Sequence, residues 1–342
     1  MTWNQVAPVF FANGVNQTSI NSMIVFNNHL YATCFVNTEM SGQLLVWNGV
    51  NAWVQVAVGP TPVDVLSNGW GVQNQGSIGT SYAGGNQGMA VFNGNLFGVV
   101  DQSNPGGVLF QWDGVSAWIL KANYYLNGAV DNRGMTDLCV FNNQLYGTDA
   151  GFGGHLFQWN GTNAWVMVAD TYGFKSCARS MCVFNNHLYA IAGQSGHIAG
   201  GYLFQWNGTN AWTVAAPIPN GHVGRSSNTL VFNNNLYCVI DGVLFQWNNT
   251  NAWVNVAPAQ YQYANELFIW NGSLYSCGGT DIYKWNGFNA WVLFDTMPLV
   301  VDNLVVFNNT LFASSTGKLY ERVPTPALPG IGNLTIVPKG RI

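Results

Sequence analysis

Hydrophobic and polar residues alternate in short runs along the whole chain, and Asn- and Gly-rich turns separate the runs. Alternation with a period of two is typical of β-strands that bury one face. Asn and Gly tolerate the positive φ of tight hairpin turns, so each such turn is expected to join antiparallel strands. In one clear stretch the pattern predicts four strands, Ser180–Phe184, His187–Ala192, Tyr202–Trp206 and Ala211–Ala215. This stretch therefore predicts a four-stranded antiparallel meander.

The meander belongs to a repeat. The phrase V-F-N-N-x-L-Y recurs with its aromatic residue at Phe26, Phe92, Phe141, Phe184, Phe232, Trp270 and Phe307. The mean spacing from Phe26 to Phe307 is about 47 residues, in the range of propeller repeats. Each copy except the last continues with L-F-Q-W-N-G-T-N-A-W-V-x-V-A or a close variant. A meander of this size cannot bury both faces alone, so the repeat predicts an all-β fold, a seven-bladed β-propeller of four-stranded antiparallel blades.

The two ends of the chain complement each other. The last copy ends after Lys318–Arg322 without a fourth strand, and Thr2–Pro8 matches Ala252–Pro258 in register. We therefore expect the N-terminal strand around Trp3 to complete the last blade, which removes free sheet edges. The predicted domains are a propeller, residues 1–322, and a Pro-rich C-terminal extension, residues 323–342. The N-terminal segment lacks the features of a signal peptide, so we expect no leader.

The sequence pattern of the repeat resembles that of two groups of proteins. The aromatic-turn-Trp hairpin is similar to kelch and galactose-oxidase-like propellers over nearly residues 1–323, although the double glycine of kelch repeats is absent. The L-F-Q-W-N-G-T-N-A-W-V-x-V-A hairpin also resembles repeats in structural proteins of tailed phages. The second resemblance implies a structural protein of a virion. A propeller fold by itself does not define a function.

The composition excludes several classes of protein. Charged residues make up 7% of the chain and the net charge is -4, whereas an average soluble chain is about 25% charged. The ten Lys and Arg residues are too few for the basic surface of a nucleic-acid-binding protein. The 14% of aromatic residues argues against disorder. No apolar run reaches the roughly 20 residues of a membrane helix, so we expect no membrane insertion.

Candidate binding residues lie in the connections that vary between blades. In a meander, the turns after the first and third strands lie on one face, and the other connections lie on the opposite, long-loop face. Variable loops on a rigid scaffold commonly carry binding sites. Aromatic rings could stack on sugars, and arginines could bind an acidic sugar, a carboxylate or a protein. The candidate ligand-binding residues are Trp70, Tyr82, Tyr124, Tyr125, Arg133, Tyr172, Arg179, Arg225, Tyr261 and Tyr263.

Each candidate also has a purely structural interpretation. The aromatic residues could pack between loops, and the arginines could pair with Asp131, Asp137 or Asp170. The repeated tryptophans are interpreted as wedges between adjacent sheets, because they recur in nearly every blade.

Catalytic and metal-binding motifs are missing. The chain contains no His-x-x-x-His, Cys-x-x-Cys or Gly-x-Ser-x-Gly, so we predict no catalytic residue, no metal and no cofactor. His29 and His187 are expected to face solvent in the turns. Cys139 and Cys182 occupy an equivalent apolar position and are predicted to be free thiols. We therefore expect that the protein is not an enzyme.

The leading hypothesis is a non-enzymatic structural or adhesive protein on the surface of a virion, as a decoration, fibre or tail-associated protein. Its expected partners are other structural proteins of the particle, through the 323–342 arm, and surface glycans. The first alternative is a carbohydrate-binding lectin with sites on the long-loop face, and the second is a kelch-like scaffold for protein interactions. The expected location is a virion or an extracellular surface.

Overall fold

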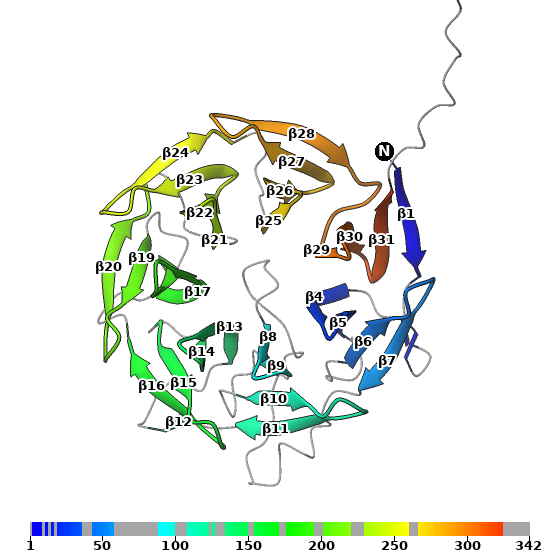
Figure 1. Cartoon of the computed structure of the whole chain (residues 1–342), viewed down its shortest axis with the longest axis horizontal. Helices are drawn as coiled ribbons and strands as arrows, with labels where there is room; N and C mark the ends of the chain where they lie inside the picture. Colours follow the sequence, from blue (N-terminus) through cyan, green and yellow to red (C-terminus); the bar gives the residue numbers. More distant parts are fainter. Residues whose placement is uncertain are drawn as a thin grey trace, which may run out of the picture.

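The strands form a closed ring of seven blades around a central axis (Figure 1). Each blade has four antiparallel strands, and the first strand of each blade lies nearest the axis. The prediction of a seven-bladed β-propeller is confirmed. The computed structural model describes residues 2–8, 11–12, 15–16, 19–35, 43–57, 88–99, 108–122, 125–126, 134–149, 154–170, 176–194, 201–219, 229–259 and 266–323.

The blades are numbered from the N-terminus. Blade 1 consists of β4 (Ser19–Phe26), β5 (His29–Phe35), β6 (Gln43–Trp47) and β7 (Trp53–Ala57), and blade 2 of β8 (Met89–Phe92), β9 (Asn95–Val99), β10 (Leu109–Trp112) and β11 (Trp118–Ala122). Blade 3 consists of β13 (Met135–Phe141), β14 (Gln144–Asp149), β15 (Leu156–Trp159) and β16 (Trp165–Ala169). Blade 4 consists of β17 (Ser176–Phe184), β18 (His187–Gln194), β19 (Gly201–Trp206) and β20 (Trp212–Pro217).

Blade 5 consists of β21 (Thr229–Phe232), β22 (Asn235–Ile240), β23 (Val243–Trp247) and β24 (Trp253–Ala257). Blade 6 consists of β25 (Glu266–Trp270), β26 (Ser273–Gly278), β27 (Asp281–Trp285) and β28 (Trp291–Thr296). Blade 7 consists of β29 (Asn303–Phe307), β30 (Thr310–Ser315), β31 (Lys318–Val323) and β1 (Thr2–Ala7). Outside the blades, β2 (Phe11–Ala12) and β3 (Val15–Asn16) form a hairpin. A short strand, β12 (Tyr125–Leu126), adds to the outer edge of blade 3.

Two kinds of turn give the ring a uniform face, which we call the short-turn face. The first two strands of each blade are joined by two residues with positive φ, as at Asn185 (46°) and Asn186 (60°), the conformation of type I′ hairpins. The third and fourth strands are joined by a loop that an Asn side chain organises. In blade 3, Asn160 Oδ1 accepts bonds from the N–H groups of Thr162, Asn163 and Ala164 at 2.9, 3.0 and 3.1 Å. The predicted positive φ of Asn and Gly in these turns is confirmed; the capping by the Asn side chain is an additional finding.

The connections of the opposite, long-loop face differ in length between blades, as predicted. In blades 5, 6 and 7 the second and third strands are joined by only two residues, Asp241-Gly242, Gly279-Thr280 and Thr316-Gly317. The corresponding connections of blades 1 to 4 are longer. Asp281 begins the third strand β27, directly after the tight Gly279-Thr280 turn. The long connections of this kind are therefore confined to one part of the ring.

The core of the molecule lies in the seams between adjacent blades. Buried apolar residues form seven clusters among the described residues, and each cluster combines two neighbouring blades. The innermost strands also contact each other in succession around the ring, ending with β29 against β4. Each blade has two apolar faces, and each face is covered by one neighbouring blade. The stability of a blade therefore depends on both of its neighbours.

A tryptophan from the third strand fills each of six seams. At the seam of blades 3 and 4, the Trp206 ring lies 5.1 Å from Tyr146 and 6.1 Å from Phe141, measured between centroids. Tilted and edge-to-face contacts at these distances are the favoured geometry of aromatic pairs. We call these residues the wedge tryptophans: Trp47, Trp112, Trp159, Trp206, Trp247 and Trp285. Their predicted structural role is confirmed.

The seam of blades 6 and 7 uses a different solution. The N-terminal strand closes blade 7 as predicted, with β1 antiparallel to β31, and Trp3 pairs with Arg322. Arg322 therefore takes the wedge position, where its guanidinium carbon lies 4.1 Å from the Phe294 ring and 4.9 Å from the Trp270 ring. Arg322 Nε also donates to Asp295 Oδ2 at 2.7 Å. Cation–π contacts and a carboxylate thus compensate for burying the charge.

Replacing a wedge tryptophan should weaken the whole ring. We expect Trp206→Ala to lower the free energy of unfolding by about 3–5 kcal/mol, because it opens a cavity in a seam. Denaturant titration followed by circular dichroism measures the change. Val183→Ala, at a position that is 38% exposed on β17, is the matched control and should change the free energy by less than about 0.5 kcal/mol. Equal effects would contradict the wedge role.

The closing seam provides a second prediction. Arg322→Trp should destabilise the protein because Trp270 is larger than the Phe of other seams and Asp295 loses its partner. Trp270→Phe should destabilise it by removing packing and the bond from Trp270 Nε1 to Asn309 O, 3.1 Å long. Together the changes restore the residue pair of the other seams, so the double variant should lose less free energy than the sum, by about 1 kcal/mol or more. A double-mutant cycle measures the coupling, and strict additivity would contradict it.

Candidate functional site

The candidate residues on the long-loop face fall almost entirely in connections outside the described residues. These are Trp70, Tyr82, Tyr124, Arg133, Tyr172, Arg225, Tyr261 and Tyr263. Two others have a described backbone. Tyr125 lies in β12, paired parallel with Trp165 at the outer edge of blade 3, whereas Arg179 lies in β17, the innermost strand of blade 4. These two backbone positions lie at the perimeter and on the channel side of the ring, respectively.

The histidines with described side chains have local partners. His29 and His187 are exposed as predicted, and each Nδ1 lies 2.8 Å from the carbonyl oxygen of the residue two before it, Asn27 or Asn185. His155 Nδ1 lies 2.8 Å from Asp149 Oδ2, and the His155 N–H donates to Asp149 Oδ1 at 3.2 Å. No motif in the sequence indicates this last pair, which links the two ends of the β14–β15 connection.

The thiols and metal-binding groups add no catalytic cluster to the part of the chain that is described. Cys34, Cys139, Cys182, Cys238 and Cys277 are free thiols, as predicted for Cys139 and Cys182. Burial raises the pKa of the Cys34 and Cys182 thiols to about 12, so these thiols are not activated nucleophiles. Among the described residues, no three His, Cys, Asp or Glu side chains gather where they could hold a metal ion. No described helix is long and apolar enough to cross a membrane.

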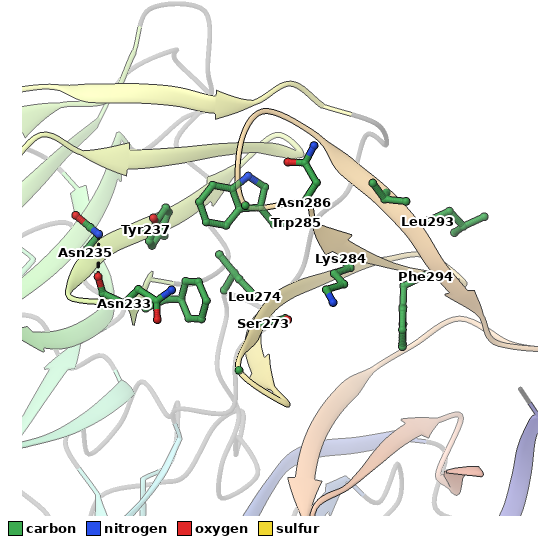
Figure 2. Close-up of a pocket in the computed structure, with 14 residues that line it drawn as sticks. Asn233, Asn235, Tyr237, Ser273, Leu274, Lys284, Trp285, Asn286, Leu293 and Phe294 are labelled. Carbon is green, nitrogen blue, oxygen red and sulfur yellow. Dashed lines mark hydrogen bonds between the residues drawn. The ribbon is translucent and has the colours of Figure 1, made fainter. Parts of the chain in front are cut away.

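The structure instead shows a pocket on the short-turn face, at the seam of blades 5 and 6 (Figure 2). Its volume is about 680 Å³. Phe232, Asn233, Asn235 and Tyr237 of blade 5 line it on one side. Blade 6 contributes the wedge Trp285, Lys284 and the turns that begin at Gly272 and Asn286, together with Leu274 and residues 292–294 of β28. Figure 2 shows Trp285 beside Tyr237, with Ser273, Leu274 and Lys284 on the neighbouring strands of blade 6.

A second pocket, of about 470 Å³, lies at the seam of blades 2 and 3 and is built from the equivalent repeat positions. Phe92, Asn93, Asn95 and Phe97 replace the four blade 5 residues. Blade 3 supplies the residues that are equivalent in the repeat to those of blade 6. The positions of Gly272, Ser273, Leu274, Lys284, Trp285, Asn286 and Gly287 are occupied, in this order, by Asn143, Gln144, Leu145, Gln158, Trp159, Asn160 and Gly161. Because the lining belongs to the repeat, the pocket is a property of the repeat and not of one blade.

The two pockets share a chemical organisation. The floor consists of buried Phe, Leu and aromatic side chains, such as Phe97 and Leu145, and the rim consists of exposed or half-buried amides. Gln158 Nε2 donates to Gln144 Oε1 at 3.1 Å, which holds one rim amide while leaving the Gln158 carbonyl and the Gln144 amino group for other partners. Among the described residues, none that lines the smaller pocket is charged, and Lys284 is the one charged residue that lines the larger.

The sequence contained a signal for these pockets. A polar Gln precedes the wedge tryptophan at Gln111, Gln158, Gln205 and Gln246, and the residues on either side of it in the strand are apolar. Binding residues are expected on the long-loop face because its connections vary, and the uniform short turns do not by themselves indicate a binding role. Whether the short turns leave a hollow between adjacent blades depends on how the blades pack, which the repeat pattern does not specify.

Buried carboxyl groups line the innermost strands and join adjacent blades. They occupy the position four residues before the repeat aromatic, and each bonds across the seam to the next blade. Asp137 Oδ2 accepts from the Met181 N–H at 2.6 Å, and Glu266 Oε2 accepts from the Leu304 N–H at 3.0 Å. Polar residues occupy the same position in blades 4 and 7. Ser180 Oγ accepts from the Thr229 N–H at 2.7 Å, and Asn303 Nδ2 donates to Ile20 O at 2.7 Å. These bonds hold the inner strands in register around the channel.

Burial dominates the titration of both carboxyl groups. Loss of hydration raises the pKa of Asp137 well above its usual value and the pKa of Glu266 to about 8, although the cross-seam N–H bonds favour the ionised forms. Two buried carboxyls with raised pKa values would be candidate acids if they converged. They belong to blades 3 and 6, on opposite sides of the ring, so they do not form a pair (Figure 1).

Comparison with known proteins identifies the fold. No family model matches the chain, and no curated protein matches its sequence. The WD40 β-propeller domain of Doa1 aligns with a TM-score of 0.58 at 10% identity, over 93% of this chain and 96% of that one. The computationally designed protein Ika8 gives 0.56 at 9% identity, over 93% and 98%. PorZ of Porphyromonas gingivalis gives 0.58 at 15% identity, over 89% and 46%. At these identities the likeness shows the β-propeller fold alone.

The buried Glu266 predicts a pH dependence of stability. Its pKa is about 8 in the folded protein against an ordinary value of 4.5, so the folded state binds more protons between these values. The stabilising contribution is complete below about pH 4.5 and is lost as the pH rises through 8. The melting temperature should therefore fall across this range. Glu266→Gln keeps an acceptor for the Leu304 N–H and removes the charge.

Thermal melts at a series of pH values test this. The curve of melting temperature against pH should be flatter in Glu266→Gln, and flatter again when Asp137→Asn is added. Val140→Ala, on the same strand as Asp137, should shift the curve without changing its slope. An unchanged slope in Glu266→Gln would show that other groups determine the pH dependence.

Proposed function

We propose that the protein is a non-enzymatic structural or adhesive β-propeller of a particle surface, a virion in the first instance, and that it binds its target through many equivalent positions. The observation that supports this most directly is the pair of pockets built from the same repeat positions at two separate seams of one face. Equivalent sites on a rigid ring act together on a multivalent surface, and avidity then exceeds the affinity of one site.

Two further features support an adhesive role over catalysis. The chain is only 7% charged, whereas catalysis relies on titratable groups that converge in a cleft. The two acids of the inner strands that show strongly raised pKa values are used in cross-seam bonds to backbone N–H groups. The resemblance of the repeated hairpin to structural proteins of tailed phages favours a virion as the particle.

A protein-interaction scaffold is the second candidate. Exposed apolar residues recur just after the fourth-strand tryptophan, at Val54, Ile119 and Val254. They place apolar side chains at the perimeter of the ring, where neighbouring structural proteins of the same particle could dock. In the virion proposal this perimeter, together with the 323–342 arm, would attach the protein to the particle, while the short-turn face remains available for the target.

Quantitative mass spectrometry of purified particles tests the proposal. The protein should be present in a fixed, stoichiometric ratio to the main structural protein, and the ratio should be unchanged after further gradient purification. Mild protease treatment of intact particles, followed by identification of released peptides, should show that the propeller is exposed. Absence from particles, or a copy number that falls with each purification step, would contradict the proposal.

A further inference from the structure

We infer that the pockets of the short-turn face bind neutral saccharides, with one site at each seam that contains a wedge tryptophan. This inference rests on the proposed adhesive function and assigns its ligand class and its face. The two observed pockets have volumes of about 470 and 680 Å³, within the roughly 300–1,000 Å³ of small-molecule sites. They are hollows, whereas a protein partner typically covers a broad and flatter area.

The floor and rim of the pocket match the two faces of a sugar. Aromatic and leucine side chains form an apolar floor, at Phe92, Phe97, Leu145 and Trp159 in the smaller pocket. The apolar C–H groups of a pyranose can pack on such a floor, consistent with the general behaviour of aromatic surfaces. The rim supplies primary amides, which carry donors and acceptors together. Neighbouring hydroxyl groups of a saccharide also need both donors and acceptors.

Charge narrows the ligand class. A nucleotide or a carboxylate ligand would need cationic groups to replace its hydration. In the part of the chain that the structure describes, no residue lining the smaller pocket is charged, and Lys284 is the one charged residue lining the larger. The Lys284 ammonium lies 5.8 Å from the Tyr275 ring centroid. A neutral ligand therefore fits both pockets, and an anionic ligand would fit at most one of them.

The repeat extends the site to the other seams. Each wedge tryptophan is followed by an Asn or Asp that organises the loop at the pocket rim, as Asp113 does in blade 2 by accepting N–H bonds at 2.8, 2.8 and 3.0 Å. The seam of blades 6 and 7 lacks both parts, because Arg322 replaces the tryptophan and Val323-Pro324 follows it. The ring should therefore carry six sites, at the six seams of the wedge tryptophans.

The test begins with the full chain on an array of neutral and sialylated glycans, followed by calorimetric titration with the strongest neutral hit. The pocket variant combines Gln111→Ala, Gln158→Ala, Gln205→Ala, Gln246→Ala and Lys284→Ala. These changes alter five of the six sites, because Val46 precedes the wedge tryptophan at the seam of blades 7 and 1. The number of sites that bind with wild-type affinity should therefore fall from six to one. Gln158→Ala with Gln144→Ala should instead remove one site and lower the stoichiometry by one. Asn255→Ala, an exposed amide on the outer strand β24, is the matched control and should bind as the wild type does.

Circular dichroism and gel filtration must show that each variant is folded, and a crystal of the wild-type protein soaked with the same glycan gives an independent readout. Sugar density beside Trp159 or Trp285 would support the inference. The inference would be overturned by any of four results: no array binding by folded protein, a preference for sialylated glycans, an unchanged number of wild-type sites in the folded pocket variant, or sugar density on the long-loop face. If the protein is stoichiometric in particles but binds no glycan, the saccharide inference fails and the adhesive or structural function stands.

Discussion

The structure depends on one constraint: a four-stranded blade has two apolar faces and can cover neither by itself. The wedge tryptophan meets this constraint by packing against the two aromatic side chains of the preceding blade, as Trp206 does against Phe141 and Tyr146. Because each blade is both a supplier and a receiver of this contact, the core consists of separate seam clusters, and closure of the ring is required to cover the last blade. The wedge tryptophans and the aromatic residues that they contact therefore both stabilise the ring and repeat the same packing from seam to seam.

The near-absence of charge follows from how the turns are built. In a typical protein, charged side chains make the loops soluble. Here amide side chains perform this role, and the same amides also organise the backbone, as Asn160 does with three N–H groups. An amide that already accepts these bonds is held in place at the pocket rim. The short-turn face is thus polar and carries few charged groups, a combination suited to binding neutral polar ligands and poorly suited to binding nucleic acid.

The fold could be predicted from the sequence because the repeat determines it locally. The Asn-Asn turns, the strand alternation and the match of Thr2–Pro8 to a fourth strand each follow from residue patterns, and the pairing of β1 with β31 confirms the match. The cross-seam bonds of Asp137 and Glu266 could not be predicted, because they join residues more than 35 positions apart through backbone groups. The pockets were missed for a related reason: their walls come from two blades, and only the packing of the blades creates the hollow.

The exceptional seam shows how structure and binding are linked. Closing a ring with the N-terminal strand leaves blade 7 without a covalent connection between its third and fourth strands, so no Trp-Asn-Gly loop can form there. Arg322 fills the wedge position instead, held by Phe294, Trp270 and Asp295. A guanidinium can satisfy a buried carboxylate and stack on rings at once, which no other side chain does as well. The seam that closes the ring consequently lacks the tryptophan and the loop that form the wall and rim of the two described pockets, since the closure replaces both.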